Sequence, residues 1–158
     1  SVALQKAEQL KNLHVAFIEQ PLPADDWQGM QQLKQQIAFI LIADESFQTI
    51  GDLKQIMDCF HGVNVKLMKC GGISKAFDIV KSARQLNAKL LLGCMSESSC
   101  GIATAVAIQQ LFDWVDLDGP LLINNNPFAG VRYNEGKIFI ENNIGTGALP
   151  VESTLRVQ

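Results

Sequence analysis

The sequence has few histidines and cysteines and no long apolar run, and each shortage argues against a class of protein. Its two histidines, His14 and His61, stand far apart, and its four cysteines lack the paired spacing of a zinc site. No apolar run approaches the roughly 20 residues of a membrane-spanning helix. We therefore expect reduced thiols, a cytoplasmic location and no membrane partner.

The charge composition gives no basic surplus. The chain has 13 basic and 16 acidic residues among 158, a net charge of -3, which offers no basic surface for nucleic acid. Its 47% hydrophobic and 18% charged residues are ordinary for a globular protein. We expect one domain with a real core and no nucleic-acid partner, and the composition leaves a homo-oligomer open.

Short apolar segments recur at a regular spacing. They begin near residues 14, 39, 63, 89 and 114, and helical patterns separate them. This is the period of a β-α unit, and continuous apolar runs indicate parallel strands buried on both faces. A doubly wound sheet and a (β/α) barrel both fit. The Gly-x-Gly-x-x-Gly motif of dinucleotide folds does not occur, whereas polar residues follow nearly every strand, which favours a barrel.

Five such units are too few to close an eight-stranded barrel. We therefore expect residues 1–158 to form the C-terminal part of a larger barrel domain whose first strands lie elsewhere. After residue 120 the period stops, and Val131–Tyr133 and Lys137–Ile140 predict a two-stranded β-hairpin.

Charged residues end two neighbouring strands. Glu19 and Asp44 follow successive strands, and two carboxylates so placed can share a hard cation such as Mg²⁺. The alternative interpretation is that each acid caps the following helix.

Lys66 ends the third strand. A lysine in a partly buried cleft loses proton affinity and can act as a base, so we expect a lowered pKa. Lys69 is the alternative candidate, but Asn64 and Lys66 share one strand face, which favours Lys66. After the strand, Gly71 and Gly72 turn the chain, and Ser74 is predicted to cap the next helix.

Four segments resemble the muconate-lactonizing subgroup of the enolase superfamily. They are Phe-Ile-Glu-Gln-Pro at 17–21, Ala-Asp-Glu-Ser at 43–46, Asn-Val-Lys at 64–66 with Gly-Gly at 71–72, and the stretch 95–99. They occur in the family's order, and the resemblance runs from about residue 1 to 150. Asp-Leu-Asp-Gly-Pro at 116–120 is similar to the dipeptide epimerases, of the L-Ala-D/L-Glu epimerase type.

This resemblance implies a (β/α)7β barrel and a reaction. The implied activity is magnesium-dependent epimerisation of a dipeptide by 1,1-proton transfer through an enediolate. Glu19 and Asp44 match two of the family's three Mg²⁺ ligands. Lys66 matches one of its two acid/base lysines.

The resemblance also implies substrate contacts. Asp116 and Asp118 match the pair that holds the α-ammonium group of the dipeptide, and Cys94 lies where the family's seventh strand contacts the substrate. The same metal and lysine set could serve a muconate cycloisomerase or an o-succinylbenzoate synthase, whose substrates offer no ammonium group. A non-catalytic half-barrel that binds a ligand is the other alternative.

Some family features have no counterpart in residues 1–158. These are the first metal ligand, the Lys-x-Lys motif with the second lysine, and the N-terminal capping domain. We therefore expect this stretch alone to be inactive.

Overall fold

The computed structural model describes residues 2–141 and 144–151, and its centre is a five-stranded parallel sheet. The strands are β1 (Phe17–Glu19), β2 (Ile40–Ala43), β3 (Gly62–Lys66), β4 (Lys89–Gly93) and β5 (Trp114–Val115), paired in that order. The predicted strands and their parallel order are confirmed.

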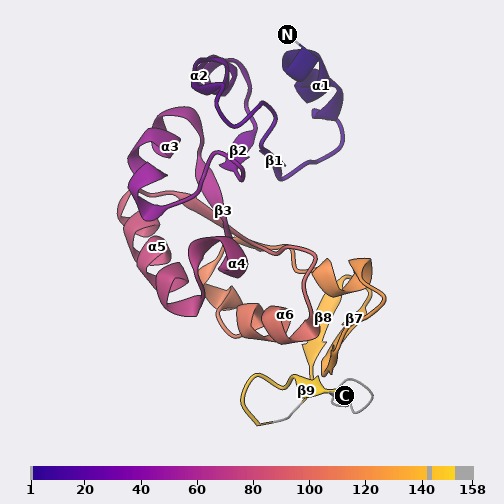
Figure 1. Ribbon diagram of the computed structural model, residues 1–158. Coiled ribbons are helices and arrows are strands. Elements are labelled where there is room, and N and C mark those ends of the chain that lie inside the picture. The colour runs from indigo at the N-terminus through magenta and orange to yellow at the C-terminus, as the bar shows by residue number, and fades with distance from the viewer. Residues whose placement is uncertain (1, 142–143, 152–158) are drawn as a thin grey trace.

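Helices connect the strands and cover one side of the sheet. They are α1 (Val2–Leu10), α2 (Trp27–Gln36), α3 (Leu53–Cys59), α4 (Leu67–Cys70), α5 (Ile73–Gln85) and α6 (Ser99–Val106), with the 3-10 turns η1 (Ile50–Asp52), η2 (Gln109–Leu111) and η3 (Gly119–Leu122). Figure 1 shows α2, α3, α5 and α6 along the convex outside of a curve whose inside holds the strands. The fold is a curled half-barrel, which confirms the predicted fold class.

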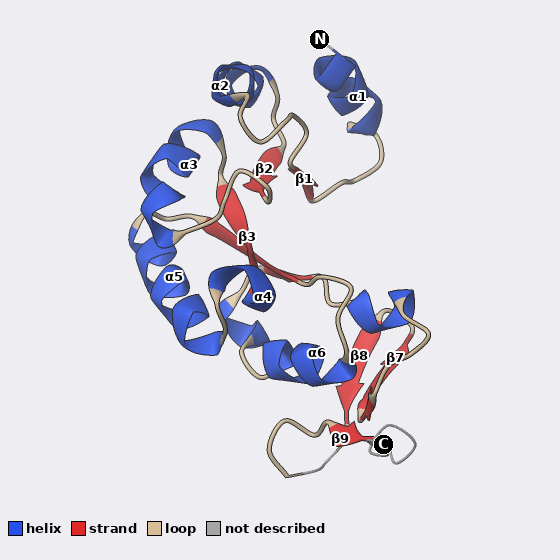
Figure 2. Ribbon diagram, viewed as in Figure 1, coloured by secondary structure: helices blue, strands red, loops and turns tan. Residues whose placement is uncertain are grey.

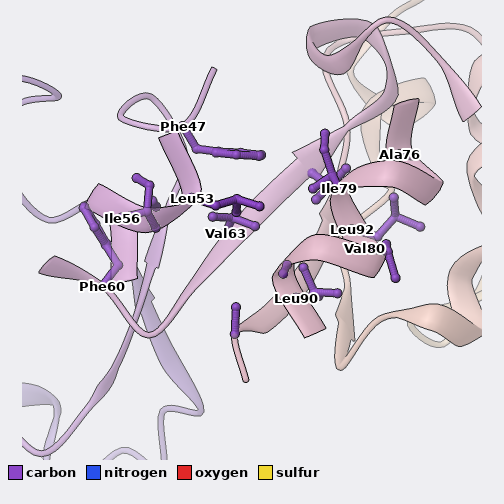
Figure 3. Packing of buried hydrophobic residues seen from close by; sticks show 14 of the residues in the cluster. Phe47, Leu53, Ile56, Phe60, Val63, Ala76, Ile79, Val80, Leu90 and Leu92 are labelled. Atoms are coloured by element: carbon purple, nitrogen blue, oxygen red, sulfur yellow. The ribbon is translucent and has the colours of Figure 1, made fainter. Parts of the chain in front are cut away.

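Strand alternation separates the core from the barrel interior. Successive side chains of a strand point to opposite faces. In β3, Val63 and Val65 join the core under the helices, whereas Asn64 and Lys66 face the interior of the curve. Figure 3 shows part of this core, which includes Phe47, Leu53, Ile56, Phe60, Val63, Ala76, Ile79, Val80, Leu90 and Leu92. Burying each large apolar side chain contributes about 1.5–3 kcal/mol.

An aromatic contact shows how strongly the sheet curls. Phe17 lies on β1 and Trp114 on β5, which are the two edges of the sheet. Their ring centroids are nevertheless only 4.9 Å apart. The interior of the half-barrel is therefore packed between its edge strands, and the polar residues further along each strand lie beyond this aromatic pair.

Two details of the predicted elements are wrong. The first strand was expected from residue 14, but His14 has a φ of 52°, and the strand begins only at Phe17. Ser74 does not cap its helix. The preceding Gly71 and Gly72 have φ values of 90° and 100°, and the helix starts two residues earlier than predicted, at Ile73 with Gly72 as its N-cap.

The predicted hairpin is present as β7 (Val131–Asn134) and β8 (Lys137–Ile140), and it closes the C-terminal end in Figure 2. Glu135 and Gly136 make its turn with positive φ values, as a type I′ turn requires. Beside it, β6 (Phe128–Ala129) pairs antiparallel with β9 (Leu149–Pro150), which was not predicted. Within the described residues, no helix is both long and apolar enough to cross a membrane.

Candidate active site

One cavity lies at the carboxyl ends of the five parallel strands. It has a volume of about 360 Å³, and its wall consists of Glu19, Gln20, Asp44, Glu45, Asn64, Lys66, Cys94, Asp116 and Asp118. All six residues singled out in the sequence are part of this wall. Five carboxyl groups face one lysine there, so the cavity is suited to cationic ligands.

Asp44 is the most constrained carboxylate of the cavity. Lys66 Nζ donates to Asp44 Oδ2 at 2.6 Å, and Lys69 Nζ donates to Oδ1 at 2.8 Å and to the backbone oxygen at 2.7 Å. The side chain of Asp44 is only 11% exposed. Both candidate lysines therefore hold the same acid, but Lys66 belongs to the cavity wall whereas Lys69 reaches Asp44 from α4.

Because of these contacts, the pKa of Lys66 is raised, whereas the sequence led us to expect a lowered pKa. Burial lowers the pKa of Lys66, but the hydrogen bond to Asp44 and the negative charges around it outweigh burial, and the net pKa is raised. The pKa of Asp44 is lowered for the matching reason, because its two lysine partners outweigh its burial. The expectation of a lowered lysine pKa ignored the adjacent acid, so it is wrong for this arrangement.

Gln20 connects the ends of β1 and β2. Its Oε1 accepts from the backbone N–H groups of Asp44 and Ser46 at 3.0 and 3.2 Å, and its Nε2 donates to Leu22 O and Ser46 Oγ, both at 2.9 Å. Gln20 has a φ of 36°, in the left-handed region that non-glycine residues seldom adopt. This side chain therefore fixes the loop that carries Asp44.

Glu19 accepts a hydrogen bond from a residue two strands away in the sheet. Asn64 on β3 donates from Nδ2 to Glu19 Oε1 at 2.6 Å, passing over the intervening strand β2. Asn64 is 3% exposed, whereas Glu19 is half-buried. One oxygen of Glu19 is thus engaged on the protein side of the cavity.

The Asp116–Asp118 loop is fixed from both sides. The Asp116 N–H donates to Leu92 O at 2.9 Å, and Tyr133 on the hairpin donates to Leu117 O at 2.6 Å. Burial, and then the charge of Asp118, raises the pKa of Asp116. Burial also raises the pKa of Tyr133 to about 12, so its hydroxyl keeps the proton that it donates.

Cys94 supports the same loop through its sulfur. The backbone N–H of Gly119, just after Asp118, donates to Cys94 Sγ at 3.3 Å. A Cβ at Gly119 would lie 2.2 Å from Met95 O, so only glycine permits this approach of the two loops. Cys94 therefore lies beside the acidic pair.

The donor set suits a hard cation but is incomplete. Among residues 2–141 and 144–151, no group of three or more His, Cys, Asp or Glu side chains is arranged to hold a metal ion. Glu19 and Asp44 supply carboxylate oxygens to one cavity, which is the ligand chemistry that Mg²⁺ prefers. The donors fit Mg²⁺ in kind, and a further oxygen ligand is needed.

The sequence interpretation missed the supporting residues Gln20, Asn64 and Tyr133, and it treated Lys69 only as a rival of Lys66. Asn64 carried a usable signal, because it stands two residues before Lys66 on the same strand face. The other contacts depend on loop geometry, which the sequence pattern does not specify.

Known proteins resemble this chain in sequence and in fold. Residues 1–148 match the enolase C-terminal domain-like family. The chain belongs to that family. It is 42% identical over 132 residues to an L-Ala-D/L-amino acid epimerase of Maribacter sp., covering 84% of this chain and 39% of that protein. It is 38% identical over 149 residues to an L-Ala-D/L-Glu epimerase of Bacteroides thetaiotaomicron, covering 94% of this chain and 39% of that protein.

A solved structure shows the same fold. The substrate-liganded complex of the L-Ala-D/L-Glu epimerase from Bacillus subtilis superimposes with a TM-score of 0.82 at 27% identity, covering 94% of this chain and 44% of that one. The chain thus spans about two fifths of the length of these relatives.

Proposed function

We propose that the protein carrying this chain epimerises a dipeptide by 1,1-proton transfer in a Mg²⁺-dependent reaction. The observation that carries the proposal is the convergence of five carboxyl groups and one lysine on a single cavity at the strand ends. The relatives named as an L-Ala-D/L-amino acid epimerase and an L-Ala-D/L-Glu epimerase support the same reaction class.

Asp116 and Asp118 would select the substrate. A dipeptide in solution carries an α-ammonium group, and two carboxylates at a fixed loop give it charge-assisted hydrogen bonds. Burial, and then the negative charge of Asp118, raises the pKa of Asp116, and a bound ammonium group would offset both effects. This pair favours a dipeptide over the acids used by a muconate cycloisomerase or an o-succinylbenzoate synthase, which offer no ammonium group.

Lys66 would move the proton. Its Nζ faces the cavity and is 2.6 Å from Asp44 Oδ2, so the arrangement favours the protonated form that donates. To accept a proton, Lys66 must first lose its own. Among the described residues of the cavity wall, Lys66 alone carries an amine, so two-base epimerisation requires a second base from outside this wall.

Glu19 and Asp44 would hold Mg²⁺ together with a further oxygen ligand. When bound, the ion would offset the negative charge that develops beside the substrate carboxylate as the α-proton leaves. Gln20 and Lys69 would then position Asp44, because Gln20 holds the backbone of its loop and Lys69 its carboxylate.

The test is proton exchange in heavy water. The protein as encoded by its gene is incubated in D₂O with Mg²⁺ and a library of dipeptides, and mass spectrometry records α-deuterium incorporation. We expect exchange for one class of dipeptide and none for its N-acetyl derivatives, which lack the ammonium group. Equal exchange of the acetylated compounds would refute the role of Asp116 and Asp118. No exchange with any dipeptide would refute the proposed activity.

A further inference from the structure

We propose that Asn64 is a positioning residue for Glu19 and that Gly93 exists to make room for it. The inference rests on the proposed metal role of Glu19. It concerns two uncharged residues, Asn64 and Gly93, because the Asn64 amide occupies the space that a side chain at position 93 would fill.

The contact between Asn64 and Glu19 joins two strands that are not neighbours. Asn64 lies on β3 and Glu19 on β1, 45 positions apart in the sequence. The amide is buried, with 3% of the residue exposed, and its Nδ2 lies 2.6 Å from Glu19 Oε1. A charge-assisted hydrogen bond of this length restricts the carboxylate to one orientation. The other oxygen of Glu19 remains for a ligand in the cavity.

Gly93 makes this position of the amide accessible. A Cβ built at Gly93 would lie 2.3 Å from Asn64 Oδ1 and 2.6 Å from Nδ2, so the amide would have to move away to make room for it. Gly93 is the last residue of β4 and pairs with Lys66 in the ladder. Its backbone needs no left-handed conformation, so the missing side chain, rather than the backbone, explains glycine here.

The other end of the same amide indicates a functional rather than a stabilising role. Asn64 Oδ1 is buried and has no hydrogen-bond partner among the described residues. An unpaired buried acceptor costs stability, and an apolar side chain of the same shape would avoid that cost. Leucine has that shape. The presence of asparagine, despite the stability cost of its unpaired Oδ1, is explained by its Nδ2 group, which orients Glu19 and which leucine lacks.

This reasoning separates stability from metal affinity. Replacing Asn64→Leu removes the unpaired oxygen, which raises the Tm, and the hydrogen bond to the half-buried Glu19, which lowers it, so the net change in Tm should be small. The same variant should weaken Mg²⁺ binding about 10- to 100-fold, the usual effect of removing a group that orients a metal ligand. A residue with only a structural role would change both quantities in the same direction.

The experiment measures Mg²⁺ affinity by isothermal titration calorimetry and Tm by thermal unfolding in the absence of Mg²⁺, in the full gene product. The variants are Asn64→Leu, Asn64→Ala, Gly93→Ala and the double variant of the two alanine changes. Gly93→Ala should weaken Mg²⁺ binding like Asn64→Leu, because its methyl group displaces the amide. The double variant should bind Mg²⁺ no more weakly than either alanine variant, and its Tm should exceed that of Gly93→Ala because the methyl group fills the vacated space.

Asn126→Leu is the matched control. Asn126 makes three hydrogen bonds, to the backbone and hydroxyl of Ser99 and to the Phe128 N–H, and it lies outside the cavity wall. The Asn126→Leu variant should have a lower Tm than the parent and an unchanged Mg²⁺ affinity. The Asn64→Leu variant should show the reverse, with a similar Tm and a weaker Mg²⁺ affinity.

Two results would overturn the inference. Parental Mg²⁺ affinity in Asn64→Leu, or fully additive losses in the double variant, would remove the positioning role while leaving the proposed function intact. If the parent protein itself binds no Mg²⁺, both the inference and the proposed metal site fail.

Discussion

Gln20 offers the sharpest test of how the site is held together. The change Gln20→Met keeps the length of the side chain and removes all of its hydrogen bonds. Two backbone N–H groups, of Asp44 and Ser46, lose their acceptor, and both residues are more than nine-tenths buried. Each orphaned donor costs about 1–3 kcal/mol, so the free energy of unfolding should fall by roughly 2–6 kcal/mol. The unusual φ of Gln20 does not enter the difference, because methionine bears the same strain.

The assay is equilibrium unfolding in urea followed by circular dichroism, with equal m-values as the condition for comparing midpoints. Gln48→Met is the matched control, because Gln48 is exposed and its side chain makes a single surface contact, to Glu45 O. It should change the unfolding free energy by less than about 0.5 kcal/mol. Gln20→Glu should fall between the two, because a carboxylate still accepts from both backbone groups but cannot donate to Ser46. A Gln20→Met variant within about 0.5 kcal/mol of the parent would refute the reasoning.

Three further predictions concern the rest of the cavity and the strand beneath it. Asp116→Asn should lower kcat/KM for dipeptides about 10- to 100-fold through the loss of one charged hydrogen bond, and steady-state kinetics with unchanged values would contradict the ammonium site. Tyr133→Phe removes the bond to Leu117 O and should lower the unfolding free energy by about 1 kcal/mol and raise KM more than it alters kcat. Burial, helped by Lys34, lowers the pKa of His61, whose neutral Nδ1 accepts from the Leu41 N–H. The unfolded chain therefore binds the proton more readily, so this contribution to stability is complete above the ordinary histidine pKa of about 6.5 and is lost as the pH falls below it. His61→Asn should flatten the Tm between pH 7.5 and pH 5, values chosen to bracket about 6.5, and an unchanged slope would exclude His61 as its source.

The sequence predicted the strands well because parallel strands under helices are buried on both faces. Their apolar runs are short and continuous, and each is followed by a polar residue at the same edge. The start of the helix after Lys66 was predicted less well. The turn after Lys66 contains the extra helix α4 and two glycines with positive φ, so the serine that looked like a cap lies within the first turn of α5. Cap residues act through local geometry, and a glycine pair can replace them.

The cavity residues were predictable for a different reason. Period-two alternation places Asn64 and Lys66 on one face of β3. Because the carboxyl ends of parallel strands meet at one edge, most of the polar residues that end the strands line the cavity. The electrostatic state was not predictable. Whether a lysine loses or gains proton affinity depends on the distance to Asp44, and the sequence places the two residues 22 positions apart without fixing that distance.

The adjacent residues Glu19 and Gln20, at the end of β1, each contact a different neighbouring part of the sheet. Glu19 ends β1 with its carboxylate bound to Asn64, and Gln20 then adopts its left-handed conformation and reaches the loop after β2. A single strand exit therefore supplies one proposed metal ligand and fixes the backbone of the other. The left-handed residue costs about 1–2 kcal/mol, which the four hydrogen bonds of its amide offset. Gln20→Gly would relieve this strain and lose all four bonds, so it should be less stable than the parent. If Gln20→Gly were more stable than the parent, the strain at Gln20 would cost more than its four hydrogen bonds contribute. The hydrogen bonds from Gln20 to the loop that carries Asp44 would then not stabilise the end of the sheet.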